Sequence, residues 1–178
     1  MTKKNSISGQ KSRAKSNKSV KGSDKVYTLA VYVIGGPVTK EFDGKEISRT
    51  IQIKGNQTLE NLHRAIFNAF DRWEEHLYEF ILGKGPYDRS AIYSPHADMV
   101  DWGDGDEDMG DVAETTIDSL GLKVDRAFGY RFDFGDEWLH QINVVTIDEF
   151  AGKGRYPKIK KRVSKSPPQY PDIDEEEI

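Results

Sequence analysis

Apolar and polar residues alternate along two stretches of the chain. Every second residue from 27 to 33 is apolar, and Ile47, Ile51 and Ile53 alternate with Ser48, Thr50 and Gln52. A period of two is typical of a half-buried β-strand. Gly35-Gly36-Pro37 ends the first stretch, and Gly44 lies in the polar connection to the second. We therefore predict two strands joined as a wide hairpin.

The period changes after Thr58, where apolar residues recur at helical spacing: Leu62, Ile66, Ala69, Phe70 and Trp73. The Thr58 hydroxyl can cap the first free N–H groups of a helix, and Glu60 lies in the first turn, where a negative charge is favourable. The pattern predicts one main helix that buries this apolar stripe.

The rest of the central region predicts mainly strands. Residues 76–82 and 91–93 predict a third strand and a short fourth, residues 96–111 a loop, and residues 116–120 a helical turn that Gly121 ends. Two alternating stretches, 128–134 and 138–144, predict a tight hairpin through Gly135-Asp136-Glu137. The order predicts a single α+β domain, with one main helix packed on a mixed sheet. By analogy, its β-β-α-β opening is β-grasp (ubiquitin)-like.

Charge divides the chain into three regions. Residues 1–22 contain seven bases and no acid, residues 151–166 another seven bases and no acid, and residues 167–178 five acids and no base. The chain between them carries 25 acids and 12 bases, which the overall charge of −4 conceals. We predict a disordered basic N-terminal arm at 1–24, a folded domain at 25–150, and a tail at 151–178 that is first basic, then Pro-rich and acidic.

Composition excludes several classes of protein. The chain has no cysteine, so disulfides, thiolate metal sites and cysteine nucleophiles are excluded. Its basic start is followed by no apolar leader, and its longest apolar stretch is too short to span a membrane. The acidic body excludes a uniformly basic nucleic-acid binder. We therefore expect a cytoplasmic protein that does not interact with membranes.

Two segments resemble the plasmid pRiA4b ORF-3-like family. The first runs from Leu62-His63 through Trp73 to His76-Leu77-Tyr78-Glu79-Phe80, and the second is Tyr130-Arg131-Phe132-Asp133-Phe134-Gly135-Asp136-Glu137-Trp138-Leu139-His140. They match a helix with an aromatic end that leads into an H-L-Y-x-F strand, followed by Y-x-Y-D-F-G-D-x-W-x-H. The resemblance covers residues 26–148. It implies a β-grasp-like α+β domain, found on plasmids and chromosomes, with no established activity. After residue 148 the chain departs from the family's Pro-Pro-Glu-Asp, Gly-Gly and Tyr segment.

Histidine and aspartate side chains supply one candidate polar or metal site. Asp133-Phe134-Gly135-Asp136 resembles the magnesium motif of kinases, but no Gly-rich loop, strand lysine or H-R-D string accompanies it. Hairpin chemistry explains this string well, because Asp and Gly suit turns. If these residues converge in space, they could hold Zn²⁺, Mn²⁺ or Fe²⁺. The candidates are His63, His76, Asp133, Asp136 and His140. The alternative is that the histidines are hydrogen-bonded core residues.

Residues 101–111 form a second candidate site, because six of these eleven residues are acidic. From Asp104 the spacing begins like an EF-hand loop, but Met109 replaces the required glycine and Thr115 the bidentate glutamate. Weak Ca²⁺ or Mg²⁺ binding would use Asp101, Asp104, Asp106, Asp108 and Asp111. The alternative is a solvated acidic loop.

Three functions remain open. The first is a non-enzymatic binding or adaptor domain of a mobile-element-associated family, whose sheet face or hairpin end binds a protein partner. The second is a nucleic-acid-associated accessory protein whose basic arms contact phosphates. The third is a metal-dependent enzyme that uses the His/Asp site. We expect no cofactor, with a divalent cation as the alternative, and the sequence does not indicate an oligomeric state.

Overall fold

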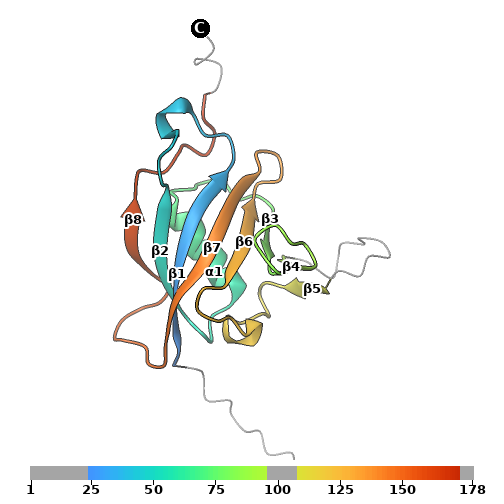
Figure 1. The fold of residues 1–178 in the computed structure, drawn as a ribbon, viewed down its shortest axis with the longest axis vertical. Coiled ribbons are helices and arrows are strands. Elements are labelled where there is room, and N and C mark those ends of the chain that lie inside the picture. Colours follow the sequence, from blue (N-terminus) through green and yellow to red (C-terminus); the bar gives the residue numbers. More distant parts are fainter. Residues whose placement is uncertain (1–23, 96–107, 173–178) are drawn as a thin grey trace, which may run out of the picture.

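The structure, a computed structural model, describes residues 24–95 and 108–172. One sheet of eight strands has the order β5-β4-β3-β6-β7-β1-β2-β8 (Figure 1). All neighbours in it are antiparallel except the parallel pair β4–β5. The strands are β1 Val26–Gly35, β2 Ser48–Lys54, β3 Tyr78–Ile81, β4 Ala91–Ser94, β5 Asp108–Asp111, β6 Ala127–Phe132, β7 Trp138–Asp148 and β8 Lys158–Val163. The helices are α1 Leu59–Ala69 and the 3₁₀ turns η1 Lys40–Phe42 and η2 Asp118–Leu120. The prediction of a single α+β domain with one main helix on a mixed sheet is confirmed.

Both predicted hairpins are present. β1 pairs with β2 from Val26↔Lys54 to Tyr32↔Ser48, and β6 pairs with β7 from Ala127↔Asn143 to Phe132↔Trp138. β6 and β7 lie between β1 and β3 in the sheet. The β-grasp likeness of the opening therefore stays a prediction.

Helix α1 covers one face of the sheet and buries the predicted stripe. The Thr58 hydroxyl accepts from the Asn61 N–H, and the Asn61 side chain accepts from the Thr58 N–H, which closes a capping box. At the other end, Asp71 adopts a left-handed φ of 56°, and the Arg72 N–H donates to the Phe67 carbonyl. This Schellman arrangement ends the helix and sends residues 72–77 across the end of the β6–β7 hairpin.

Three predicted elements differ in extent. Trp73 is not part of the buried stripe: it follows the end of α1 and its side chain is 69% exposed. The third strand begins at Tyr78, so His76 lies in the connection before it. Residues 108–111, predicted as loop, form β5 beside β4, while residues 96–107 lie outside the described residues.

No helix in the described part of the chain is long and apolar enough to cross a membrane. Cytoplasmic localisation stays a prediction.

The C-terminal boundary also differs from the predicted one at residue 150. Lys158–Val163 pairs with β2 as the edge strand β8, and residues 164–172 continue over the end of the molecule (Figure 1). Lysine and arginine suit this place because an edge strand exposes their charged ends, which also discourage pairing with other sheet edges. The predicted N-terminal arm lies outside the described residues except for Asp24.

Candidate functional site

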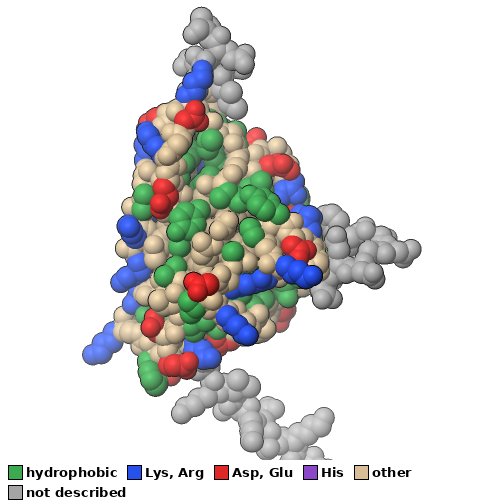
Figure 2. Space-filling view, viewed as in Figure 1, with side chains coloured by type: hydrophobic (Ala, Val, Ile, Leu, Met, Phe, Trp, Pro, Cys, Tyr) green, Lys and Arg blue, Asp and Glu red, His purple; other side chains and the backbone are tan. Residues whose placement is uncertain are grey.

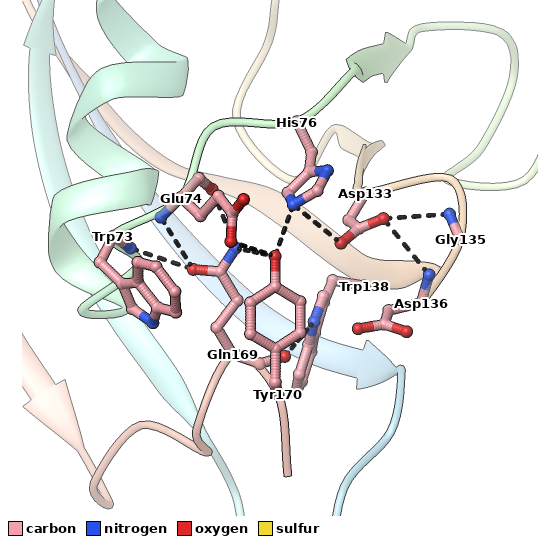
Figure 3. A network of polar contacts seen from close by, with 9 residues as sticks. All are labelled: Trp73, Glu74, His76, Asp133, Gly135, Asp136, Trp138, Gln169 and Tyr170. Carbon is pink, nitrogen blue, oxygen red and sulfur yellow. Dashed lines mark hydrogen bonds and ion pairs between the residues drawn. The ribbon is translucent and has the colours of Figure 1, made fainter.

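The link between β6 and β7 contains the Asp-Phe-Gly-Asp string and forms one wall of a polar network (Figure 3). Asp133 has a φ of 58°, and its Oδ1 accepts from the backbone N–H of Gly135 at 3.0 Å and of Asp136 at 3.4 Å. The Asp133 side chain thus stabilises the turn, to which Asp136 contributes its backbone N–H. Hairpin chemistry explains most of this string.

The C-terminal segment, residues 164–172, docks between this hairpin and the connection after α1. Gln169 is 3% exposed, and its Oε1 accepts from the Trp73 N–H at 3.0 Å and the Glu74 N–H at 3.2 Å. Its Nε2 donates to the Glu74 carbonyl at 2.8 Å, and its own carbonyl accepts from Trp138 Nε1 at 3.3 Å. The Gln169 amide therefore both accepts from and donates to the backbone of residues 73 and 74, as the backbone of a neighbouring strand does.

Tyr170 closes the network at the surface. Its hydroxyl lies 2.6 Å from His76 Nε2 and donates to Glu74 Oε2 at 2.9 Å, and its ring meets Trp73 edge-on at 5.6 Å. His76 Nε2 is also 3.5 Å from Asp133 Oδ2. Because the tyrosine and the aspartate meet the same ring nitrogen, the imidazole cannot relay a proton between them through its two nitrogens.

Arg72 and Trp138 form the floor of the network. The Arg72 guanidinium lies 3.8 Å from the Trp138 ring centre, and its Nη1 donates to the Pro167 carbonyl at 3.3 Å. Its Nε and Nη2 have no hydrogen-bond partner within the described ranges. Burial lowers the pKa of Arg72 to about 10, so the side chain stays charged at neutral pH.

His140 lies in the core rather than in this network. Its side chain packs against Phe70 and Tyr130 at ring distances of 5.1 and 5.3 Å, and within the described residues neither ring nitrogen has a partner at hydrogen-bond geometry. Burial, together with the positive charge of Arg72, lowers its pKa to about 3. The ring is therefore neutral at physiological pH.

His63 occupies a second buried position, on α1. Its ring stacks on Tyr78 at 3.5 Å, Nδ1 lies 2.8 Å from the Tyr130 hydroxyl, and Nε2 lies 3.3 Å from Glu75 Oε2. Burial lowers the pKa of His63 to about 4, and the Glu75 carboxylate offsets part of that shift. This is a hydrogen-bonded core histidine.

The five predicted site residues therefore do not share one site. The structure brings His76 and Asp133 together, whereas His63 and His140 point into the core because they lie on the inner faces of α1 and β7. Within residues 24–95 and 108–172, no three His, Cys, Asp or Glu side chains are placed to hold a metal ion.

The predicted cation loop is only partly visible. Asp101, Asp104 and Asp106 lie outside the described residues. Asp108 begins β5, and the Asp111 carboxylate accepts from the Ala113 N–H at 2.6 Å, as in a turn.

Sequence analysis missed the residues that complete the network, above all Gln169, Arg72 and Glu74. The segment that contains Gln169 and Tyr170 was predicted to be a tail. The only available signal was weak: Ile159 and Val163 among the bases of residues 158–163, and Pro167-Pro168 a few residues later, are compatible with an edge strand followed by an extended segment.

The sheet face opposite α1 is a second candidate surface. On β6, β7, β1 and β2, three cross-strand rows of this face contain no charged residue: Gln52, Thr28 and Thr146; Thr50, Ala30, Asn143 and Ala127; and Ser48, Tyr32, Gln141 and Gly129. On the edge strand β8 the first row continues to Lys158 and the second to Lys161. A hollow of about 400 Å³ is lined by Tyr32, Gln141 and Asn143 and, at its border, by the acidic residue Asp125. Figure 2 shows mainly hydrophobic and uncharged atoms in the middle of this face, and Lys and Arg side chains along the border where β8 lies.

Beyond Gly129 the connection between β3 and β4 covers this face. Arg126 donates to the Leu82 carbonyl at 3.1 Å and the Lys84 carbonyl at 2.8 Å. A Cβ on Gly129 would lie 2.2 Å from the Pro86 carbonyl oxygen, so this position requires glycine. The open face is thereby confined to β1, β2 and β7.

Comparisons with known proteins agree with this fold. The chain is similar to the crystal structure of MM3350, a protein of unknown function from Methanosarcina mazei Go1, with 24% identity and a TM-score of 0.58 over 78% of this chain and 69% of that chain. No curated protein matches the chain. The family model of the plasmid pRiA4b ORF-3-like proteins matches residues 38–173, so the likeness continues past residue 148 into β8 and the C-terminal segment. The chain therefore belongs to the plasmid pRiA4b ORF-3-like protein family.

Proposed function

We propose that this protein is a non-enzymatic binding domain that docks a protein partner on the open face of β1, β2 and β7. The observation that carries the proposal is the absence of charge from the three cross-strand rows on β6, β7, β1 and β2, in a chain in which 31% of residues are charged. The lysines that end two of these rows on β8 lie at the rim of the face. The central part of a protein–protein interface is depleted in charged residues and enriched in tyrosine, and Tyr32 lies beside the hollow of this face.

Burial of the face supports the same proposal. Thr28, Tyr32, Thr50, Gln141 and Asn143 are all half-buried, so they offer contact area with little rotamer freedom left to lose. Amide and hydroxyl groups among them can form hydrogen bonds with a partner without the desolvation penalty of a charge.

Site-specific photo-crosslinking tests the proposal. A photoreactive phenylalanine analogue replaces Tyr32 on the face, and in a matched control it replaces Tyr87, which is 67% exposed but lies in the connection between β3 and β4. In cells of the native host, we expect a discrete protein adduct from position 32, lost when Asn143→Glu is added. Equal adducts from both positions, or none from position 32 in folded protein, would contradict the proposal.

The basic residues of the edge strand β8 favour a second candidate function, contact with nucleic acid. Four of the six residues of β8 are basic: Lys158, Lys160, Lys161 and Arg162. Successive residues of a strand lie about 3.3 Å apart. Lys160 and Lys161 are exposed at the free edge of the sheet, where they can contact phosphates.

Salt-dependent binding to duplex DNA tests this candidate. The Lys160→Glu, Lys161→Glu double variant is expected to lower affinity and to reduce the slope of log K against log salt by about 2. The matched control changes the same total charge at Lys84 and Lys123, which are exposed away from β8. Equal losses in the two double variants would show that only net charge matters.

A further inference from the structure

The C-terminal segment is held at its docking site in the way that a bound peptide is held. We call this the tryptophan site. It is formed by Trp73, Glu74, His76 and Trp138 (Figure 3), together with Arg72, which lies against the Trp138 ring. Along the segment, Pro167 and Gln169 are buried while Pro168 and Tyr170 are exposed. Such alternation is typical of an extended peptide laid on a surface with every second residue inserted.

Recognition in the tryptophan site is specific to Gln169 and Tyr170. The Gln169 amide forms three hydrogen bonds with the backbone of residues 73 and 74, a set that neither a carboxylate nor a shorter amide reproduces with the same reach. The Tyr170 hydroxyl meets His76 and Glu74, while its ring contacts Trp73. Proline-rich segments dock readily on such aromatic surfaces because their extended conformation is already formed.

Arg72 contributes a buried cation to the tryptophan site. Arg72 is 7% exposed, yet two of its three guanidinium nitrogens have no partner in the part of the chain that the structure describes. Only Nη1 is engaged, at 3.3 Å from the Pro167 carbonyl. A peptide that replaces the segment must therefore present a carbonyl at the same place, where it forms a charge-assisted hydrogen bond.

We propose that the tryptophan site binds an extended Pro-Pro-Gln-Tyr sequence of another polypeptide, and that the chain's own C-terminal segment is a tethered competitor for it. A short tether places the competitor at an effective concentration in the millimolar range. The segment therefore weakens the binding of any external peptide until it is displaced. This site is separate from the open sheet face.

Fluorescence anisotropy with a labelled Ser-Lys-Ser-Pro-Pro-Gln-Tyr-Pro-Asp peptide tests the proposal on the full chain. The Gln169→Ala, Tyr170→Ala variant weakens the tethered competitor, so we expect it to bind the peptide at least tenfold more tightly than the wild type. Adding Trp73→Ala, at a side chain that is 69% exposed, is expected to abolish this gain. Adding Tyr87→Ala, at an equally exposed site, leaves it unchanged.

Two further measurements keep the test decisive. A peptide with alanine in place of Gln and Tyr is expected to bind the double variant at least tenfold more weakly, and equal binding of both peptides would overturn the proposal. If the double variant does not fold, millimolar peptide that carries a nitroxide spin label is added to wild-type protein, and loss of the Trp138 indole N–H signal is followed by NMR. An undiminished signal would overturn the proposal, and so would concentration-dependent dimers that exclude the peptide, because a second copy would then be the occupant.

Discussion

Replacing His140 with leucine is expected to remove a large part of the acid sensitivity of this protein. His140 is 2% exposed, and its pKa is lowered to about 3 by burial and by the charge of Arg72. In the unfolded chain the same imidazole has a pKa of about 6.5. The unfolded state therefore takes up a proton as the pH falls below about 6.5, while the folded state stays neutral until about pH 3.

The sign and size of the effect follow from this difference. Each pH unit between the two pKa values costs the wild type about 1.4 kcal/mol of folding free energy, so at pH 4 the cost is about 3 kcal/mol. Leucine keeps the contacts with Phe70 and Tyr130 and cannot be protonated. Near pH 7.5 we expect the two proteins to agree within about 1 kcal/mol, because leucine has a similar volume and leaves no buried ring nitrogen unpaired.

Urea unfolding from pH 7.5 to 4 measures this difference. The free energy of unfolding of the wild type should fall below that of His140→Leu progressively as the pH drops under about 6.5. His63, whose pKa is lowered to about 4, is present in both proteins, so its contribution cancels in the difference. Two curves that stay parallel throughout would refute the assignment of His140 as a buried neutral histidine.

Three further substitutions test the fold around the site. Arg49→Met is expected to lower the free energy of unfolding by about 3 kcal/mol and to speed hydrogen exchange in residues 158–166, because Arg49 donates to Ala69, Val163 and Ser166 from a side chain that is 1% exposed. Gly36→Ala should destabilise the protein in thermal melts, because residue 36 has a φ of 130° and the alanine Cβ would lie 2.7 Å from the Trp138 ring. Gly85→Ala is the control and should change the melting temperature little, because a Cβ there meets nothing within 4 Å. Thr58→Ala should cost about 1 kcal/mol in urea unfolding through loss of the α1 cap; no loss would show that the capping box contributes little.

Local signals in the sequence were sufficient for the parts of the fold that depend on neighbouring residues. Alternating residues and Gly-rich connections identified the β1–β2 and β6–β7 hairpins, and Thr58 identified the start of α1. The family likeness was also visible locally, because its D-F-G-D-x-W-x-H string lies within one hairpin.

Long-range contacts decided the rest. β8 pairs with β2 across more than a hundred residues. Four of its six residues are Lys or Arg, so the strand shows no apolar alternation, although a lysine can cover a sheet edge with its apolar stem. Trp73 continues the helical spacing, but Asp71 at positive φ ends α1 before it. No local pattern encodes such choices.

The candidate site, too, combines residues that the sequence indicated with contacts that only the tertiary structure determined. The sequence alone gave histidines and aspartates that looked able to meet, but strand pairing separated His63 and His140 from His76 and Asp133. Only the tertiary structure brought Gln169 and Tyr170 against residues 73–76, some 95 positions earlier in the chain. The reason is physical: a side chain's chemistry is fixed by its residue type, whereas its partners are fixed by packing that the whole chain determines.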